Sequence, residues 1–226
     1  MNHFYKTALN FKNLKKKVVP NMTQLSQSLK KETRTHHSFT EQQMNAKAIF
    51  SEEYSADAYK NHLEQLLNAH TIIDHVAQQH LAAIESFNLQ YISRVNDLKY
   101  DLKSLNHPIN FDKEHISVSL KITGLAQLIG MLYVVKGSQL GGHFIGKKID
   151  QHLKRWSIEK PQKFYKLSDA ETLNAHWQAW CKHINKLSTG PSFNKEAIDS
   201  AKITFDVFCH PEDYATFKTE STLGNH

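Results

Sequence analysis

One apolar segment constrains the fold of this chain more than any other part of the sequence. It runs from Leu125 to Ile149 and reads LAQLIGMLYVVKGSQLGGHFIGKKI. Its apolar residues recur at steps of three and four, the spacing of a buried helix: Leu125, Leu128, Ile129, Leu132, Val135, Leu140, Phe144 and Ile149. We therefore expect one long buried helix, around which the other elements pack.

The second half of this helix is rich in glycine. Gly137 and Gly141 are four residues apart, as are Gly142 and Gly146, so each pair shares one helix face. An interior glycine costs about 1 kcal/mol of helix stability relative to alanine. A flat or bulky group can, however, press directly against backbone that carries no side chains. Close packing of another helix, or a kink, would explain the same glycines, and the pattern alone leaves these interpretations open.

The remainder of the chain also has helical periodicity and no strand pattern, which predicts an all-α fold. Phe39 in the first helix and Ile92 in the third are predicted to face the core. We expect a single domain over residues 21–217, with a basic extension at 1–20 and a short tail at 218–226. The other expected helices begin at Asn21 or Thr23, after a turn at 51–55, at about Asn88, at about Asp169, and at Asn194 as a cap.

Composition narrows the class of protein. The chain has 226 residues, of which 40% are hydrophobic, so it is long enough for one packed domain. It has no uncharged apolar run of the roughly 18 residues that span a membrane, and no secretory signal at its start. Cys181 and Cys209 fit no metal or redox spacing, as expected of reduced thiols in a cytoplasmic protein. The net charge is +6, but the sequence has no aromatic platform that would support nucleic-acid binding.

Conventional side-chain catalysis has little support in the sequence. His70, His75 and His80 are five residues apart, so each is rotated by about 140° from the last and they cannot share a helix face. No zinc or di-iron motif and no nucleotide-binding glycine motif is present. What remains is an inward histidine near the N-terminus, His36 or His37, and the glycine-bearing helix. Together they suit a flat cofactor with an imidazole on one face and bare backbone on the other.

Three segments resemble the haem oxygenase family, closest to its bacterial, biliverdin-producing members. The run Leu29-Lys30-Lys31-Glu32-Thr33, continued through His37 to Glu41, matches the pattern L-K/R-x-x-T-x3-H-x3-E. Arg94, Leu98, Asp101 and Leu102 are similar to R-x3-L-x2-D-L, and LYVVKGSQLGG at 132–142 resembles LYVLEGSTLGG. The resemblance covers roughly residues 23–210 in the family's order. It implies a single-domain, haem-oxygenase-like helical bundle.

On the proximal side, the resemblance implies that His37 is the axial ligand of the haem iron. Glu41, one helical turn on, would accept a hydrogen bond from the ring and fix its tautomer. His36 is the alternative ligand, and only the family spacing favours His37. Lys30 matches a cation that contacts a haem propionate in some members.

On the distal side, Gly137 and Gly141 match the glycines that let the helix backbone approach the porphyrin. Ser138 would help to order the water that delivers a proton to the reacting oxygen. We expect Gly137, Ser138 and Gly141 to be the catalytic positions, while Tyr133 and Gly142 complete the predicted haem-binding set.

Some residues depart from the family pattern. Lys136 stands where glutamate is usual, and His143 stands where arginine is common, as either a second ligand or a surface residue. No counterpart of the propionate-binding cations in the last helices can be placed, so Arg155, Lys182 and Lys202 stay unassigned.

The function implied by the resemblance is the oxidative cleavage of haem, as both substrate and cofactor, to biliverdin, carbon monoxide and ferrous iron. Dioxygen is consumed, and a separate reductase or ferredoxin supplies electrons because the sequence has no flavin or nicotinamide motif. A bilin-accepting protein is a further expected partner. The alternative is a non-catalytic haem- or tetrapyrrole-binding protein of the same fold. A related thiaminase-like or di-iron enzyme is weakened by the missing nucleophile and carboxylate–histidine sets.

Overall fold

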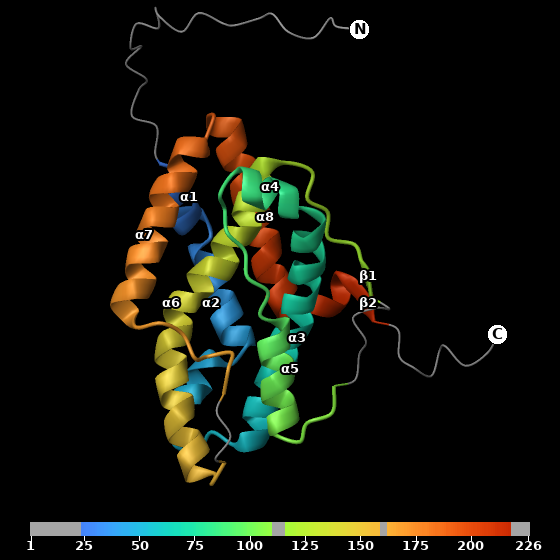
Figure 1. The fold of residues 1–226 in the computed structure, drawn as a ribbon, viewed down its shortest axis with the longest axis vertical. Helices are drawn as coiled ribbons and strands as arrows, with labels where there is room; N and C mark the ends of the chain where they lie inside the picture. Colours follow the sequence, from blue (N-terminus) through green and yellow to red (C-terminus); the bar gives the residue numbers. More distant parts are fainter. Residues whose placement is uncertain (1–23, 110–115, 159–161, 218–226) are drawn as a thin grey trace, which may run out of the picture.

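The protein is a bundle of helices, and its computed structural model describes residues 24–109, 116–158 and 162–217 (Figure 1). The all-α prediction is confirmed. The strands β1 and β2 are three residues each and pair antiparallel, with Ile116 opposite Phe217. The elements are α1 (Leu25–Glu32), α2 (Arg34–Gln43), η2 (Ala46–Phe50), α3 (Ala56–Gln79), α4 (Leu81–Ser86), α5 (Val95–Ser104), β1 (Ile116–Val118), α6 (Leu125–Arg155), α7 (Ala170–Leu187), α8 (Pro191–Cys209), η4 (Pro211–Asp213) and β2 (Ala215–Phe217).

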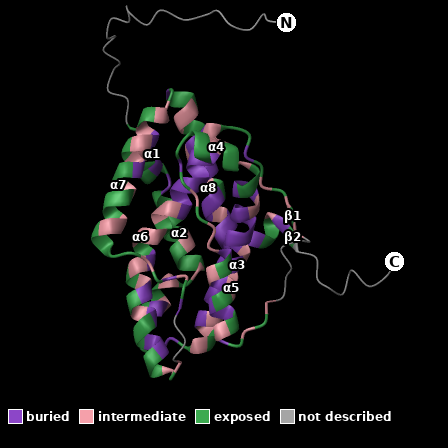
Figure 2. Cartoon of the chain, viewed as in Figure 1, coloured by how far each residue is buried: buried purple, intermediate pink, exposed green. Residues whose placement is uncertain are grey.

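The predicted long helix is α6, and it packs mainly against α8. Buried residues are concentrated on α3, α6 and α8, whereas much of α7 is exposed (Figure 2). At Gly130, α6 and α8 approach so closely that a Cβ built there would stand 2.1 Å from the carbonyl oxygen of Ala197. Only glycine permits this approach between two helix backbones. The glycine that seats α6 in the core is therefore Gly130, which the motif-based prediction did not include.

Local capping sets the start of three helices. At α3, the Ser55 hydroxyl accepts the Ala58 N–H at 3.1 Å, and at α7 the Asp169 carboxylate accepts the Thr172 N–H at 2.9 Å. α8 begins at Pro191, since proline at the first helical position is already in a helical conformation. The prediction that a cap at residue 194 starts this helix is wrong, because that residue lies one turn inside it.

The predicted first helix is two helices, α1 and α2, separated at Thr33. The Thr33 hydroxyl donates back to the Leu29 carbonyl at 2.7 Å, which satisfies a backbone acceptor at the end of α1. The change of direction lays α2 across α8, and Phe39 is 47% exposed instead of facing the core as predicted. The predicted caps Asn21 and Thr23, the extension 1–20 and the tail 218–226 lie outside the described residues.

The predicted helix from Asn88 begins later than expected, at Val95. Asn88 has a φ of 49°, and Ile92 is 76% exposed, so the prediction for this stretch is wrong. The sequence had suggested continuous periodicity, but α7 supplies other partners for the backbone. Trp180 Nε1 donates to the Leu89 carbonyl at 3.0 Å, so this stretch is stabilised without helical hydrogen bonds.

Candidate functional site

α2 presents His37 at the surface of the bundle. The Thr40 hydroxyl donates to the Phe205 carbonyl of α8 at 3.4 Å, and the Cys209 thiol approaches Thr40 at the same distance. These contacts hold α2 against the second half of α8. The His37 ring meets the edge of the Phe205 ring, with centroids 5.7 Å apart, yet 57% of the His37 side chain is exposed. The imidazole is therefore supported on one side and accessible to a ligand on the other.

Glu41 lies one helical turn from His37 and on the same face. Its Oε1 is 3.7 Å from His37 Nδ1, which is within ion-pair range but longer than a hydrogen bond. In this position the carboxylate can accept a hydrogen bond from a protonated Nδ1. When Nδ1 carries the proton, Nε2 is the nitrogen with a free lone pair. His36 interacts differently, since its Nδ1 is 3.4 Å from the Thr35 hydroxyl.

The two glycine pairs of α6 face different surroundings. A Cβ built at Gly141 would have no atom within 4 Å, whereas one built at Gly137 would lie 3.5 Å from the Trp177 ring. By contrast, a Cβ at Gly146 would stand 2.7 Å from the Tyr165 carbonyl oxygen, and one at Gly142 would stand 3.1 Å from Leu167. The Gly142–Gly146 pair is therefore a close-packing surface. In the other pair, Gly141 borders open space and Gly137 lies beside the Trp177 ring.

The open glycine lies on the side of α6 that faces the turn after η2. Gly137, Gly141, Phe144 and Lys148 follow one another at steps of four, three and four, so they form one helix stripe. Lys148 forms an ion pair with Glu52, in the turn after η2. Phe144 is 60% exposed, so its predicted burial is wrong, because this stripe borders the open space and not the core. α6 also contacts η2 directly, and Figure 1 shows α2 next to α6.

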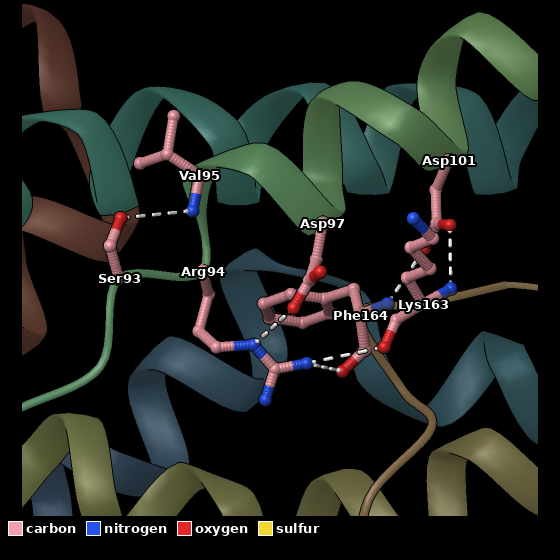
Figure 3. A network of polar contacts seen from close by, with 7 residues as sticks. All are labelled: Ser93, Arg94, Val95, Asp97, Asp101, Lys163 and Phe164. Atoms are coloured by element: carbon pink, nitrogen blue, oxygen red, sulfur yellow. Dashed lines mark hydrogen bonds and ion pairs between the residues drawn. The ribbon is translucent and has the colours of Figure 1, made fainter.

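The segment that packs on Gly142 and Gly146, residues 162–167, is fixed by the pattern Arg94-x3-Leu98-x2-Asp101 (Figure 3). Asp101 accepts the backbone N–H groups of Lys163 and Phe164 at 2.6 and 2.9 Å. Arg94 donates to the carbonyl of Phe164 and, at 3.3 Å, to that of Lys163. These two residues of the family pattern therefore clamp the segment to α5. The motif identifies both residues but does not predict this role.

A buried polar contact joins the same segment to α3. His62 Nε2 lies 2.6 Å from the Tyr165 hydroxyl, and burial lowers the pKa of His62 to about 4. The imidazole is therefore neutral near pH 7 and suited to a neutral hydrogen bond. Gln162 adds three further bonds. It accepts from the Tyr59 hydroxyl at 2.9 Å, and it donates to the Gly146 carbonyl at 3.2 Å and to the Asp150 carboxylate at 3.0 Å. These bonds fix the backbone of α6 around Gly146, which follows the open glycine, Gly141, in the same helix.

The other predicted site residues have more ordinary surroundings. The Ser138 hydroxyl donates to the Val135 carbonyl of its own helix at 2.8 Å. Tyr133 is buried, its hydroxyl interacts with the Thr33 side chain, and burial raises its pKa to about 12. It therefore links α6 to the junction of α1 and α2. Lys30 is exposed on α1. The roles predicted for these residues stay predictions.

The two departures from the family pattern both contact α7 or the segment before it. The Lys136 ammonium lies 5.8 Å from the centre of the Trp180 ring, and burial lowers its pKa. His143 Nδ1 is 3.1 Å from the Ser168 carbonyl oxygen. That bond holds the imidazole at the segment preceding α7, which favours the interpretation of His143 as a surface residue.

The described residues contain neither a multi-residue metal site nor a membrane-spanning helix. Within 24–109, 116–158 and 162–217, no cluster of three or more His, Cys, Asp or Glu side chains is arranged to hold a metal ion. A single axial imidazole, as expected at position 37, is a different kind of ligand and needs no such cluster. No helix in the part of the chain that the structure describes is long and apolar enough to cross a membrane.

Comparison with known proteins agrees with the motifs. The family model described as Heme oxygenase matches residues 23–210. The NO- and CO-bound heme oxygenase from Neisseria meningitidis has a similar structure, with a TM-score of 0.63, 24% sequence identity, and coverage of 83% of this chain and 89% of that chain. The comparison with curated proteins found no match. Because the family model spans most of the chain, the protein belongs to the haem oxygenase family.

Proposed function

We propose that the protein cleaves haem oxidatively to biliverdin, carbon monoxide and ferrous iron, using dioxygen and electrons from a separate donor. Haem is the substrate and, when bound, supplies the iron that activates oxygen. A reductase or ferredoxin delivers the electrons. The observation that carries the proposal is the pairing of an accessible imidazole on α2 with a glycine on α6 that borders open space.

The proposed role of α2 is to bind and orient. His37 presents Nε2 to the iron, while Glu41 accepts a hydrogen bond from Nδ1 and keeps the ring in the correct tautomer. Phe205 packs against the imidazole on one side.

The proposed role of α6 is to shape the opposite face of the site. At Gly141 no side chain separates the helix backbone from the ligand, so the ring can lie directly against it. That close contact excludes bulk water from the space between the backbone and the ring. Ser138 acts in the complex as a positioning group for a proton-donating water, once its hydroxyl turns from the Val135 carbonyl.

One observation favours the second candidate, a haem- or tetrapyrrole-binding protein that leaves its ligand intact. The Ser138 hydroxyl donates within its own helix and points no proton donor at the open space. If that bond persists in the complex, the ligand is bound but not degraded.

A single assay separates the two candidates. Purified protein is mixed with hemin and then with ascorbate or a reductase, and the absorption spectrum is followed. Decay of the Soret band into bilin absorbance supports catalysis, and a stable Soret band supports the binding protein. If hemin causes no Soret shift at all, both candidates are refuted.

The ligand assignment is tested by a pair of neighbouring variants. His37→Ala should weaken the hemin complex far more than His36→Ala, because the resemblance assigns the iron to His37 and its ring is held beside Phe205. Added imidazole should restore part of the Soret shift in the His37 variant. A larger loss in the His36 variant would show that the neighbouring histidine is the ligand.

A further inference from the structure

Trp177 lies at one end of the open space over α6. The edge of its six-membered ring is 3.5 Å from the position of a Cβ at Gly137, while Gly141, one turn further, has nothing within 4 Å. Gly137 is thus covered by an aromatic side chain, although it carries none itself. Trp177 is half-buried and is contributed by α7, so its position in the site follows from the packing of α7 on α6.

The indole of Trp177 is held in place by two other rings. It stacks on Trp180, with centroids 5.7 Å apart and planes inclined by 21°, and it lies 5.3 Å from the centre of the Tyr133 ring. Trp180 is itself buried, and its N–H donates to the Leu89 carbonyl. Because tryptophan has only two side-chain torsions, a ring packed in this way resists displacement.

Phe144 follows Gly141 on the same helix stripe, on the side away from Gly137. This residue lies seven positions after Gly137 on the same helix stripe, which corresponds to about 10 Å along the axis at 1.5 Å per residue. A macrocycle pressed against Gly141 therefore meets an aromatic ring at either end. Of the two, Phe144 is 60% exposed and free to yield, so the fixed limit is set by Trp177.

We propose that Trp177 is a specificity-determining residue, which fixes the in-plane position of the tetrapyrrole and thereby selects the bridging carbon at which the ring opens. The inference rests on the proposed function. The Trp177 ring occupies the volume over Gly137 and stops the macrocycle from sliding along α6. The atom that faces the reacting oxygen is thus chosen by contact with α7, a helix to which neither the axial ligand nor the open glycine belongs.

The test compares two substitutions of Trp177 with a matched change elsewhere. Trp177→Leu keeps an apolar side chain in α7 but removes the ring, and Trp177→Phe keeps a smaller ring. Trp156→Leu removes another half-buried indole, at the end of α6 and away from Gly137. Each variant is checked for folding by thermal unfolding. The bilin isomers are then separated by chromatography, and the haem methyl proton shifts are recorded in the ferric cyanide complex.

In Trp177→Leu we expect the ratio of the major to the minor bilin isomer to fall by about tenfold, which corresponds to about 1.4 kcal/mol between the competing transition states. The methyl shifts should move at the same time. Trp177→Phe should change the isomer ratio and the methyl shifts in the same direction by a smaller amount. If the leucine variant does not fold, the phenylalanine variant alone tests the proposal. Trp156→Leu should leave both readouts unchanged.

The outcomes distinguish this inference from the function on which it rests. If the wild type forms bilin, and the isomer ratio and methyl shifts of the Trp177 variants equal those of the wild type, the inference is wrong and the proposed function stands. If the wild type binds hemin but forms no bilin, the proposed function is wrong, and the methyl shifts alone decide whether Trp177 seats the ligand. If the wild type binds no hemin, both are refuted.

Discussion

Replacing single glycines of α6 by alanine should separate the two roles that these residues have in one helix. At Gly141 the added methyl group would meet nothing within 4 Å, so only the gain in helix propensity counts. Alanine is favoured over glycine in a helix interior by about 0.5–1 kcal/mol. For a chain of this size, about 1 kcal/mol shifts the unfolding midpoint by about 2–4 °C. Gly141→Ala should therefore raise the midpoint by about 1–4 °C.

The same substitution at Gly146 or Gly130 should have the opposite sign. At Gly146 the methyl carbon would lie 2.7 Å from the Tyr165 carbonyl oxygen, a backbone atom that Arg94 and Asp101 hold in place through its neighbours. Overpacking of this kind costs about 1–3 kcal/mol, which outweighs the gain in propensity. At Gly130 the contact of 2.1 Å is much shorter, so this variant should be the least stable of the three.

The assay is thermal unfolding followed by circular dichroism, combined with a hemin titration. A leucine at Gly141 should fill the open space and weaken hemin binding by at least about tenfold, or about 1.4 kcal/mol, without lowering the midpoint. Gly146→Ala should bind hemin as the wild type does while it remains folded. The reasoning is refuted if Gly141→Ala lowers the midpoint, or if the leucine variant binds hemin with unchanged affinity.

Three further predictions concern the buried polar groups around the site. Burial lowers the pKa of His62 to about 4 and that of His70 to about 3, so the unfolded chain binds these protons first. The free energy of unfolding should therefore fall as the pH is lowered from about 6.5 to 4, by up to about 1.4 kcal/mol per pH unit for each histidine. Urea titrations at several pH values should show a smaller fall for His70→Phe. Tyr165→Phe removes the 2.6 Å contact with His62 and should lower the free energy of unfolding by about 1–3 kcal/mol, measured by urea unfolding. An unchanged urea midpoint would contradict the role given to this pair. Asp101→Ala leaves two backbone N–H groups without their acceptor and should speed hydrogen exchange at Phe164. Asp199→Ala removes an exposed ion pair with Lys195 on α8 and is the control that leaves this exchange unchanged.

Much of the fold and part of the site could be predicted from the sequence. The periodicity of 125–149 predicts α6. The residues of α3 that recur at helical spacing are likewise all buried: Tyr59, Leu63, Leu66, His70, Ile73 and Ala77. Helix periodicity depends only on the order of apolar residues, so it can be read without knowing the partner surface. The order and spacing of three short motifs likewise led to the haem oxygenase family, which the match over residues 23–210 confirms.

The sequence could not decide which glycines pack and which stay open, because all of them follow the same spacing. Gly146 meets a backbone carbonyl and Gly141 meets no atom within 4 Å, a difference set by where residues 162–167 and α7 come to lie. The exposure of Phe144 and the ring of Trp177 over the helix also depend on partners distant in the chain. The amino-acid order by itself determined the helices and the family. Only the tertiary structure decided which face of α6 is free to receive a ligand, because a glycine face is defined by what packs against it.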